Sequence, residues 1–321
     1  MDEPSTERVI ASSGELACPT HLANWPARRR IANLREIAIV HRMDWHHAIA
    51  RGAGALLVLG AASVQAVAET HLHLAANGNF DANGTYTPGR IGFNLADVSD
   101  VATLDALPAD VKGLAWIGRC GGVDAGFLKV VRPYLGHENL FGFNLMDDPD
   151  PTGRYAPACS ADKLKAEADW IHANMPRAKT FIVLMNLGSS REPSFAGTYN
   201  PANSHIDLFG VSPYPCRTEL RRCDLDMVGR FVAAAEAAEI PKNAIVPVFQ
   251  SFGDGSWIDD GGGRYRLPTA AEEREIMARW DTFVPDPAFD YAYSWGTQRD
   301  DSALQASQAL QAVFWRRNIG N

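Results

Sequence analysis

Short apolar segments alternate with amphipathic segments along the chain after residue 69. Most of the apolar segments are continuous runs, which is typical of strands that are buried on both faces of a parallel sheet. The pattern therefore predicts a series of buried strands. We expect them at His71–Ala75, Ile91–Ala96, Gly113–Ile117, Leu140–Met146, Thr180–Met185, Leu208–Val211, Ile245–Phe249 and Tyr291–Trp295.

The amphipathic segments predict helices between these strands. Thr269, with acidic residues in the turn that follows it, is typical of a capped helix start. Helices are expected at Ala161–Asn174, Leu225–Ala238, Thr269–Phe283 and Ala303–Arg317. Repeated strand–helix alternation indicates an α/β fold, and this number of strands fits a (β/α)₈ (TIM) barrel. A doubly wound open sheet is the alternative, but no Gly-x-Gly-x-x-Gly turn follows the first strand.

The N-terminal part of the chain has a different pattern. Residues 1–42 are polar and contain several prolines, and we predict an upstream extension without a packed element. The apolar run Gly52–Val64, followed by the small residues Ala66–Ala68, is typical of a signal peptide over residues 43–68. That run is short and rich in Gly and Ala for a membrane span; a buried core helix is the alternative. Residues 69–321 would then form one exported barrel domain.

Cysteine usage agrees with export. Cys18 lies in the extension, and the other four form an even set, which favours disulfides in an exported protein. Cys216 and Cys223 flank a short loop, and this local pairing is the favoured one. Cys120 and Cys159 each follow a strand end, so they can pair if those strands are neighbours. A zinc site is the alternative, although no Cys-x-x-Cys accompanies these residues.

Composition and charge limit the class of partner. Hydrophobic residues make up 46% of the 321 residues and charged residues 21%, which is ordinary for a globular protein. The net charge of −8 provides no basic field to attract nucleic acid. A neutral carbohydrate is compatible with that charge. We expect a monomer that has no nucleic acid partner and needs no cofactor.

The candidate chemistry lies at the strand ends. Functional groups of a (β/α)₈ barrel gather at the carboxyl ends of its strands. The fourth predicted strand ends in Asp147 and Asp148 before Pro149, and two acids at such a position are costly unless they are used or paired. The other strand ends contribute Asp97, Trp116, Arg119, Asn186, Tyr214, Gln250 and Trp295. Converging carboxylates, amides and aromatic rings favour a sugar-binding site.

Glycoside cleavage gives these acids a role. The reaction needs one carboxylic acid to protonate the leaving oxygen and a second carboxylate as nucleophile or base. Adjacent acids repel each other, which raises one pKa and favours a proton donor. The catalytic candidates are therefore Asp148, Asp147 and Asp97. Structural alternatives are helix capping by these acids, ion pairing by Arg119, a rigid turn at Tyr214 and core packing of Trp295.

Three short motifs resemble a large clan of (β/α)₈ glycoside hydrolases. The run Asp147-Asp148-Pro149 stands where the clan has Asn-Glu-Pro or Asp-Glu-Pro at the end of strand four, and Ser212–Pro215 and Tyr293–Gly296 are also similar. The resemblance implies that Asp148 is the acid/base and Asp147 a ligand of a sugar hydroxyl. It also implies that Tyr214 orients the nucleophile and that Trp295 forms the floor of a sugar subsite.

The chain departs from that clan at two positions. The acid/base is Asp in place of Glu, and Gln250 stands where the clan has its nucleophilic Glu. Our main hypothesis is an exported glycoside hydrolase whose second carboxylate is Asp97 or Asp147. A non-catalytic carbohydrate-binding barrel is the alternative that Gln250 favours. A further alternative is a metal-dependent hydrolase that uses His71, His73 and the two adjacent acids. His71 and His73 alternate on one strand without an evident third ligand near them, and we predict no metal site.

Overall fold

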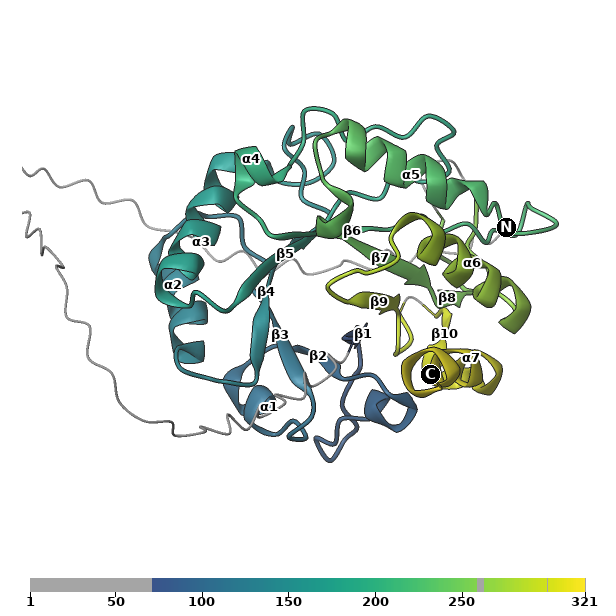
Figure 1. Ribbon diagram of the computed structural model, residues 1–321, viewed down its shortest axis with the longest axis horizontal. Coiled ribbons are helices and arrows are strands. Elements are labelled where there is room, and N and C mark those ends of the chain that lie inside the picture. Colours follow the sequence, from purple (N-terminus) through teal and green to yellow (C-terminus); the bar gives the residue numbers. More distant parts are fainter. Residues whose placement is uncertain (1–70, 259–262, 299, 321) are drawn as a thin grey trace, which may run out of the picture. The chain divides into compact units, whose positions relative to one another are not determined.

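The predicted strands form a closed ring in which every strand is parallel to its neighbours. The computed structural model describes residues 71–258, 263–298 and 300–320. In chain order the ring is β1-β2-β3-β4-β5-β6-β7-β9, and it closes where β1 pairs with β9. The helices lie outside the ring (Figure 1). The (β/α)₈ barrel is therefore confirmed, whereas the predicted extension and signal peptide lie outside the described residues.

The strand bounds agree with the apolar runs to within a few residues. The barrel strands are β1 (His73–Ala75), β2 (Leu95–Val98), β3 (Lys112–Trp116), β4 (Leu140–Asp147), β5 (Lys179–Val183), β6 (Leu208–Val211), β7 (Ile245–Gln250) and β9 (Asp290–Tyr293). The strand expected from Ile91 starts later, because Pro88–Ile91 forms a 3₁₀ helix in which proline fixes the backbone. A small antiparallel pair, β8 (Phe252–Gly253) and β10 (Ser302–Ala303), joins two loops beside the barrel.

The helices confirm the amphipathic pattern. They are α1 (Val101–Asp105), α2 (Ala125–Val131), α3 (Ala161–Asn174), α4 (Pro201–Ser204), α5 (Asp226–Ala237), α6 (Ala270–Phe283) and α7 (Gln308–Ile319). Helix α6 begins with the predicted cap, in which the Thr269 hydroxyl accepts a hydrogen bond from the Glu272 N–H at 3.3 Å. The last helix starts five residues later than predicted, because Ala303 belongs to β10 and Leu304–Ala306 is a 3₁₀ turn.

Two layers of apolar side chains hold the barrel together. Inside the ring, alternate strand residues such as Leu74, Leu114 and Val248 form one buried cluster. Outside it, the intervening strand residues pack against the helices, as Phe249 does on α7 through Phe314 at 5.9 Å. This division explains the continuous apolar runs, because both faces of each strand are covered.

A buried ion-pair network closes the ring at the amino-terminal end of its strands. The His73 Nδ1 lies 2.8 Å from Asp290 Oδ1 across the β1–β9 seam, and Arg317 Nε donates to Asp290 Oδ2 at 2.7 Å. His73 therefore stands at the start of β1, while Asp147 ends β4 at the opposite end of the barrel. The arrangement does not bring this histidine to the adjacent acids, as a shared metal site would require.

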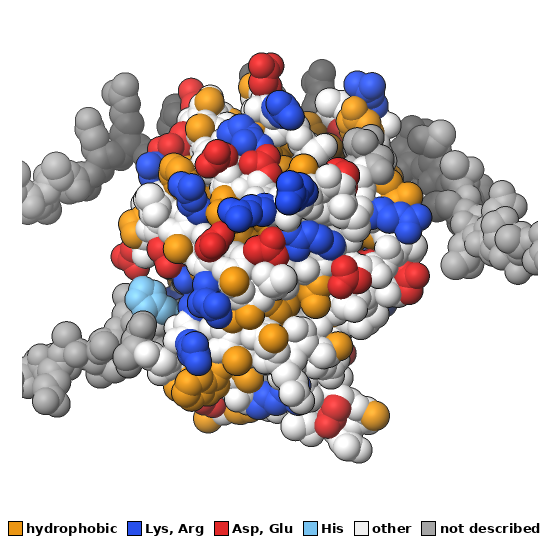
Figure 2. Space-filling view, turned by 90° about the vertical axis from the view of Figure 1, so that its right-hand side faces the viewer, with side chains coloured by type: hydrophobic (Ala, Val, Ile, Leu, Met, Phe, Trp, Pro, Cys, Tyr) orange, Lys and Arg blue, Asp and Glu red, His pale blue; other side chains and the backbone are white. Residues whose placement is uncertain are grey.

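The surface carries charges of both signs. Acidic and basic side chains are interspersed on the face shown in Figure 2, with no block of one sign. Within the described part of the chain, no helix is long and apolar enough to cross a membrane.

Glu273 on α6 is a buried acid whose titration should affect stability. Its side chain is fully buried, and neither carboxylate oxygen has a hydrogen-bond partner among the described residues. Burial raises its pKa to about 8, against the favourable charge of Arg317. The unfolded chain releases this proton near the ordinary glutamate pKa, so the folded state loses stability as pH rises from about 4.5 to 8.

We expect Glu273→Gln to stabilise the protein at pH 8 by about 4 kcal/mol and to change its stability at pH 5 by much less, because Gln mimics the protonated acid. Urea unfolding at the two pH values measures the difference. Glu275→Gln is the matched control, since Glu275 is exposed on the same helix. Equal stabilisation at both pH values would contradict the titration of Glu273.

Candidate active site

The carboxyl ends of the strands surround a cavity of about 340 Å³ at the mouth of the barrel. Inward-facing positions provide its walls because side chains alternate along each strand. On β2 and β3, the buried Leu95 and Leu114 lie below Asp97 and Trp116. The ring of Trp116 remains 38% exposed, so it offers an open aromatic surface. The structure thus brings two of the predicted residues, Asp97 and Trp116, to one cavity.

A bulge in β4 directs Asp147 into the same cavity. Simple alternation would place Asn144 and Asp147 on opposite faces, because they are three residues apart. The register against β5 shifts between Asn144 and Met146, and a bulge of this kind redirects the following side chain. As a result, Asn144 and Asp147 both line the cavity.

Asp148 lies beside this cavity and turns toward β5. Its backbone φ is 45°, in the left-handed region, which Asp tolerates better than most residues. The Asp148 Oδ1 accepts a hydrogen bond of 2.9 Å from the Asn186 N–H. The Asn186 side chain donates to the Tyr265 hydroxyl at 3.3 Å. Asn186 therefore holds the predicted acid through its backbone, while its side-chain amide bonds to Tyr265.

Burial raises the pKa of each of the three acids, and neighbouring negative charge adds to this rise at Asp147 and Asp148. Burial and the charge of Asp147 raise the pKa of Asp148 to about 7, and the Asn186 hydrogen bond opposes this rise. Burial and then the charge of Asp97 raise the pKa of Asp147 to about 6. Burial also raises the pKa of Asp97, which accepts a long hydrogen bond of 3.4 Å from the Asn77 N–H. Asp147 and Asp148 also touch solvent, so they can exchange protons with water.

Aromatic rings form one side of the site. Tyr214, which sequence reasoning selected, is nearly buried and stacks on Tyr293 at 6.0 Å. Phe252 and Tyr265 pack edge-on against it at 4.9 and 5.6 Å. Tyr293 lines the cavity, and its hydroxyl donates to Gln298 at 2.6 Å. These rings give the site a rigid, partly apolar wall beside its carboxylates.

Trp295 and Arg119 are not part of this cavity. The Trp295 ring is completely buried in the core outside the strands, and its Nε1 donates to the Thr87 hydroxyl at 2.9 Å. It therefore has no free face for the floor of a sugar subsite, and core packing, the structural alternative, describes it. Arg119 turns away from the barrel mouth, since its guanidinium lies over Gly126 of α2.

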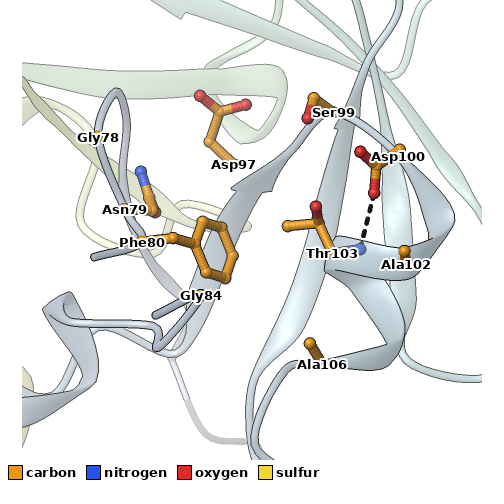
Figure 3. Close-up of a pocket in the computed structure, with 10 residues that line it drawn as sticks. All are labelled: Gly78, Asn79, Phe80, Gly84, Asp97, Ser99, Asp100, Ala102, Thr103 and Ala106. Carbon is orange, nitrogen blue, oxygen red and sulfur yellow. Dashed lines mark hydrogen bonds between the residues drawn. The ribbon is translucent and has the colours of Figure 1, made fainter. Parts of the chain in front are cut away.

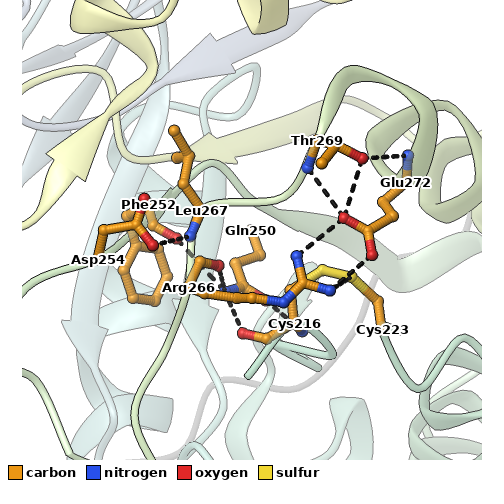
Figure 4. The surroundings of a disulfide bond; sticks show 9 residues. All are labelled: Cys216, Cys223, Gln250, Phe252, Asp254, Arg266, Leu267, Thr269 and Glu272. Atoms are coloured by element: carbon orange, nitrogen blue, oxygen red, sulfur yellow. Dashed lines mark hydrogen bonds and ion pairs between the residues drawn. A yellow bond between two sulfur atoms is a disulfide. The ribbon is translucent and has the colours of Figure 1, made fainter. Parts of the chain in front are cut away.

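Gln250 does not line the cavity, and its side chain has a structural role. Its side chain is fully buried, and its amide exchanges two hydrogen bonds with the Cys216 peptide, at 2.8 and 2.9 Å. The Nε2 also donates to the Arg266 carbonyl at 3.0 Å (Figure 4). Backbone groups therefore occupy both the oxygen and the nitrogen of the Gln250 amide. Gln250 links the end of β7 to two neighbouring loops, and the prediction that it binds substrate is not supported by its surroundings.

A carboxylate at position 250 should therefore destabilise the protein without creating a nucleophile. Gln250→Glu would place negative charge against the carbonyl oxygens of Cys216 and Arg266. We expect the free energy of unfolding to fall by about 2–3 kcal/mol, with no gain in hydrolysis. Chemical unfolding and a product-release assay measure the two effects. Greater activity of the Glu variant would contradict this role.

Both predicted disulfides are present beside the site. Cys120 and Cys159 are bonded with Cα atoms 5.5 Å apart, and Cys216 and Cys223 with Cα atoms 4.2 Å apart. The first joins the loop after β3 to the start of α3, and the second closes the loop after β6. Disulfides thus brace loops at the carboxyl end of the barrel, and the zinc alternative for these cysteines is wrong because their sulfurs are bonded to each other.

Several cavity residues were not selected from the sequence. Asn144 is a polar residue within an apolar strand, which was a detectable sign of a functional position. Tyr291 and Tyr293 are two residues apart on the last strand and line the cavity together. The remaining cavity residues lie in loops, where the sequence alone does not show which way a side chain points. They are Asn77, Ser99 and Gln298.

The chain is similar to solved barrel structures at low identity. The GH18 chitinase ChiB from the chitin utilization locus of Flavobacterium johnsoniae is 9% identical over 78% of this chain and 95% of that chain, with a TM-score of 0.47. A GH18 chitinase from Cycas revoluta in complex with (GlcNAc)3 is 11% identical over 71% and 93%, with a TM-score of 0.45.

The chitinase-like agglutinin from Robinia pseudoacacia is 12% identical over 77% and 98%, with a TM-score of 0.45. No protein-family model matches the chain, and no curated protein matches it. At this level of similarity, the residues of the site themselves decide what function is proposed.

Proposed function

We propose that the chain is an exported enzyme that hydrolyses glycosidic bonds of an oligosaccharide or polysaccharide. The observation that supports this most is the meeting of carboxylates from β2 and β4 beside a cavity with aromatic walls. Asp97 and Asp147 line that cavity together with Trp116 and Tyr293, and Asp148 adjoins them. Carboxylates bind sugar hydroxyls and supply acid/base groups, and aromatic faces stack on sugar rings.

In this proposal Asp148 donates the proton. Its raised pKa keeps it protonated at a pH at which an exposed aspartate is ionised. The proton passes to the glycosidic oxygen as the bond to the sugar breaks. A second carboxylate, Asp147 or Asp97, attacks the sugar carbon or activates a water molecule. With water added, each cleavage yields one new reducing end.

The acid pair predicts a bell-shaped pH profile. Hydrolysis should fall as pH rises through about 7, because Asp148 then loses its proton, and should fall below about 6 as Asp147 gains one. The two groups interact, so the profile reports the pair. Measuring kcat/KM against pH on aryl glycosides checks this.

A matched variant tests the origin of the alkaline limb. Asp147→Asn removes the charge that raises the pKa of Asp148, so the Asp148 carboxyl should titrate at lower pH in carboxyl NMR. An unchanged titration would show that repulsion between the acids does not set the profile.

Release of product tests the reaction class. Purified protein is incubated with neutral oligosaccharides of glucose, N-acetylglucosamine and xylose, and new reducing ends are counted. Release that depends on the protein supports the proposal, and binding without release over long incubation contradicts it.

A non-catalytic carbohydrate-binding barrel is the second candidate. The observation that favours it is Gln250, whose fully bonded amide occupies the end of β7 and leaves that strand without a carboxylate. Glycan binding with no released product would support this candidate.

Export is part of the proposal. Two disulfides favour an oxidising compartment such as the periplasm or the exterior of the cell. The location of the tagged full-length protein in cell fractions tests it.

A further inference from the structure

A second, larger cavity adjoins the acid site. It measures about 550 Å³ and lies between the loop after β1 and helix α1 (Figure 3). Asp97 and Ser99 line both this cavity and the one at the barrel mouth, so the two meet at these residues. Its size falls within the range of about 300–1,000 Å³ that is usual for ligand sites.

The walls of this second cavity combine an aromatic ring and small apolar groups with hydroxyls and two carboxylates, those of Asp97 and Asp100. Phe80 stands on one side, and Ala102 and Ala106 of the α1 region stand on the other (Figure 3). Thr103 and Ser99 contribute hydroxyls. Asp100 also lies here, but its carboxylate caps α1 by accepting a 2.7 Å hydrogen bond from the Thr103 N–H. Such a wall complements a neutral sugar. The aromatic ring can pack on the apolar face of the sugar, and the hydroxyls can bond to the hydroxyls of the sugar.

Asn79 adds an unsatisfied polar group to this cavity. Only 3% of the residue is exposed, and neither side-chain amide atom has a hydrogen-bond partner among the described residues. Its backbone is held, because the Asn79 carbonyl accepts from the Thr87 N–H at 2.8 Å and the Thr87 hydroxyl at 3.2 Å. A buried amide without partners is destabilising, and a hydroxyl of a ligand would relieve that cost.

We propose that this cavity is a second sugar subsite, and that the substrate is therefore a neutral oligosaccharide with several rings. The inference rests on the proposed function. One ring lies at Trp116 and Asp147, and the chain passes Asp97 to a further ring that packs on Phe80. Ser99, Thr103 and Asn79 bond to hydroxyls of that ring. The carboxylate of Asp97 at the junction disfavours acidic sugars.

The proposal is tested with a substitution that places a large side chain in the cavity at an exposed position, away from the core. Ala106 is exposed at the end of α1, so Ala106→Trp occupies the subsite, and Ala233→Trp, at an exposed position on α5, is the matched control. Binding is measured by calorimetry with glucose, N-acetylglucosamine and xylose oligosaccharides of two to six units. We expect Ala106→Trp to weaken binding of the longer chains by about tenfold or more and to leave the disaccharide affinity unchanged.

A second variant keeps the test independent of the introduced ring. Phe80→Ala removes the stacking surface and should weaken the same long chains, again without affecting the disaccharide. Equal affinity of wild-type and both variants for long chains would overturn the subsite while leaving the proposed function intact. A uniform loss at all lengths would also overturn it. If the wild-type protein binds no member of the series, the proposed function fails, and this inference fails with it.

Discussion

Asp148→Asn should lower kcat/KM for glycoside hydrolysis by about 10³-fold or more while leaving the fold intact. The variant retains the size of the side chain and can still accept the Asn186 N–H through its amide oxygen. It removes the proton whose transfer the reaction needs, and general acid catalysis contributes about 10²–10⁴-fold. Loss of kcat without loss of thermal stability would identify a chemical role, since the variant keeps the hydrogen bond from the Asn186 N–H.

The size of the loss should depend on the leaving group. Aryl glycosides with acidic phenols need little protonation, so Asp148→Asn should retain much more activity on them than on an unactivated oligosaccharide. Asp110→Asn, at an exposed loop position, is the matched control and should behave as wild type. Unchanged hydrolysis of the natural type of bond by Asp148→Asn would remove this residue from the mechanism.

The barrel could be predicted because its strands are covered on both faces. Runs such as Ile245–Phe249 are apolar throughout, since Val246 and Val248 fill the ring and Phe249 packs on the helices. The short strand β1 was also found, although only three residues pair there. The start of β2 was misplaced because Ile91 belongs to a 3₁₀ turn whose apolar residues also pack into the core.

The site could be predicted only in part, for reasons of local geometry. Asp97 and Trp116 were selected because they stand at predicted strand ends, and both line the cavity. Asp147 reaches the cavity through a register shift in β4, which leaves no mark in the sequence. Trp295 was expected to end the last strand, but β9 ends at Tyr293, and the indole lies in the outer core, where it donates a hydrogen bond to the Thr87 hydroxyl.

Gln250 shows how residue type misleads when its surroundings are unknown. A glutamine at a strand end suggests a substrate ligand or a lost nucleophile. In the structure its amide stabilises the loop that carries the Cys216–Cys223 disulfide. The donor–acceptor pairing with a backbone peptide requires an amide at this position, because a carboxylate could not donate to the Cys216 carbonyl. The end of β7 therefore supports the loop that carries the Cys216–Cys223 disulfide. The carboxylates that line the cavity come from β2 and β4.

The two disulfides should differ in what they stabilise. Cys120–Cys159 closes 39 residues and Cys216–Cys223 only 7. Since a cross-link stabilises by restricting the unfolded chain, the longer loop should matter more, at about 4 kcal/mol against about 2 kcal/mol. We expect Cys120→Ala/Cys159→Ala to lower the free energy of unfolding by the larger amount, measured by urea unfolding of each double variant.

The order should reverse for activity, because the shorter loop is coupled to the site. The Cys216 peptide exchanges hydrogen bonds with Gln250, and the same loop begins two residues after Tyr214, which packs on Tyr293 of the cavity wall. Cys216→Ala/Cys223→Ala should therefore reduce kcat/KM more than the other pair while costing less stability. If both properties fell together in one variant, stability alone would explain the activity loss. Opposite orders in the two measurements would show that the short disulfide holds the aromatic wall in place.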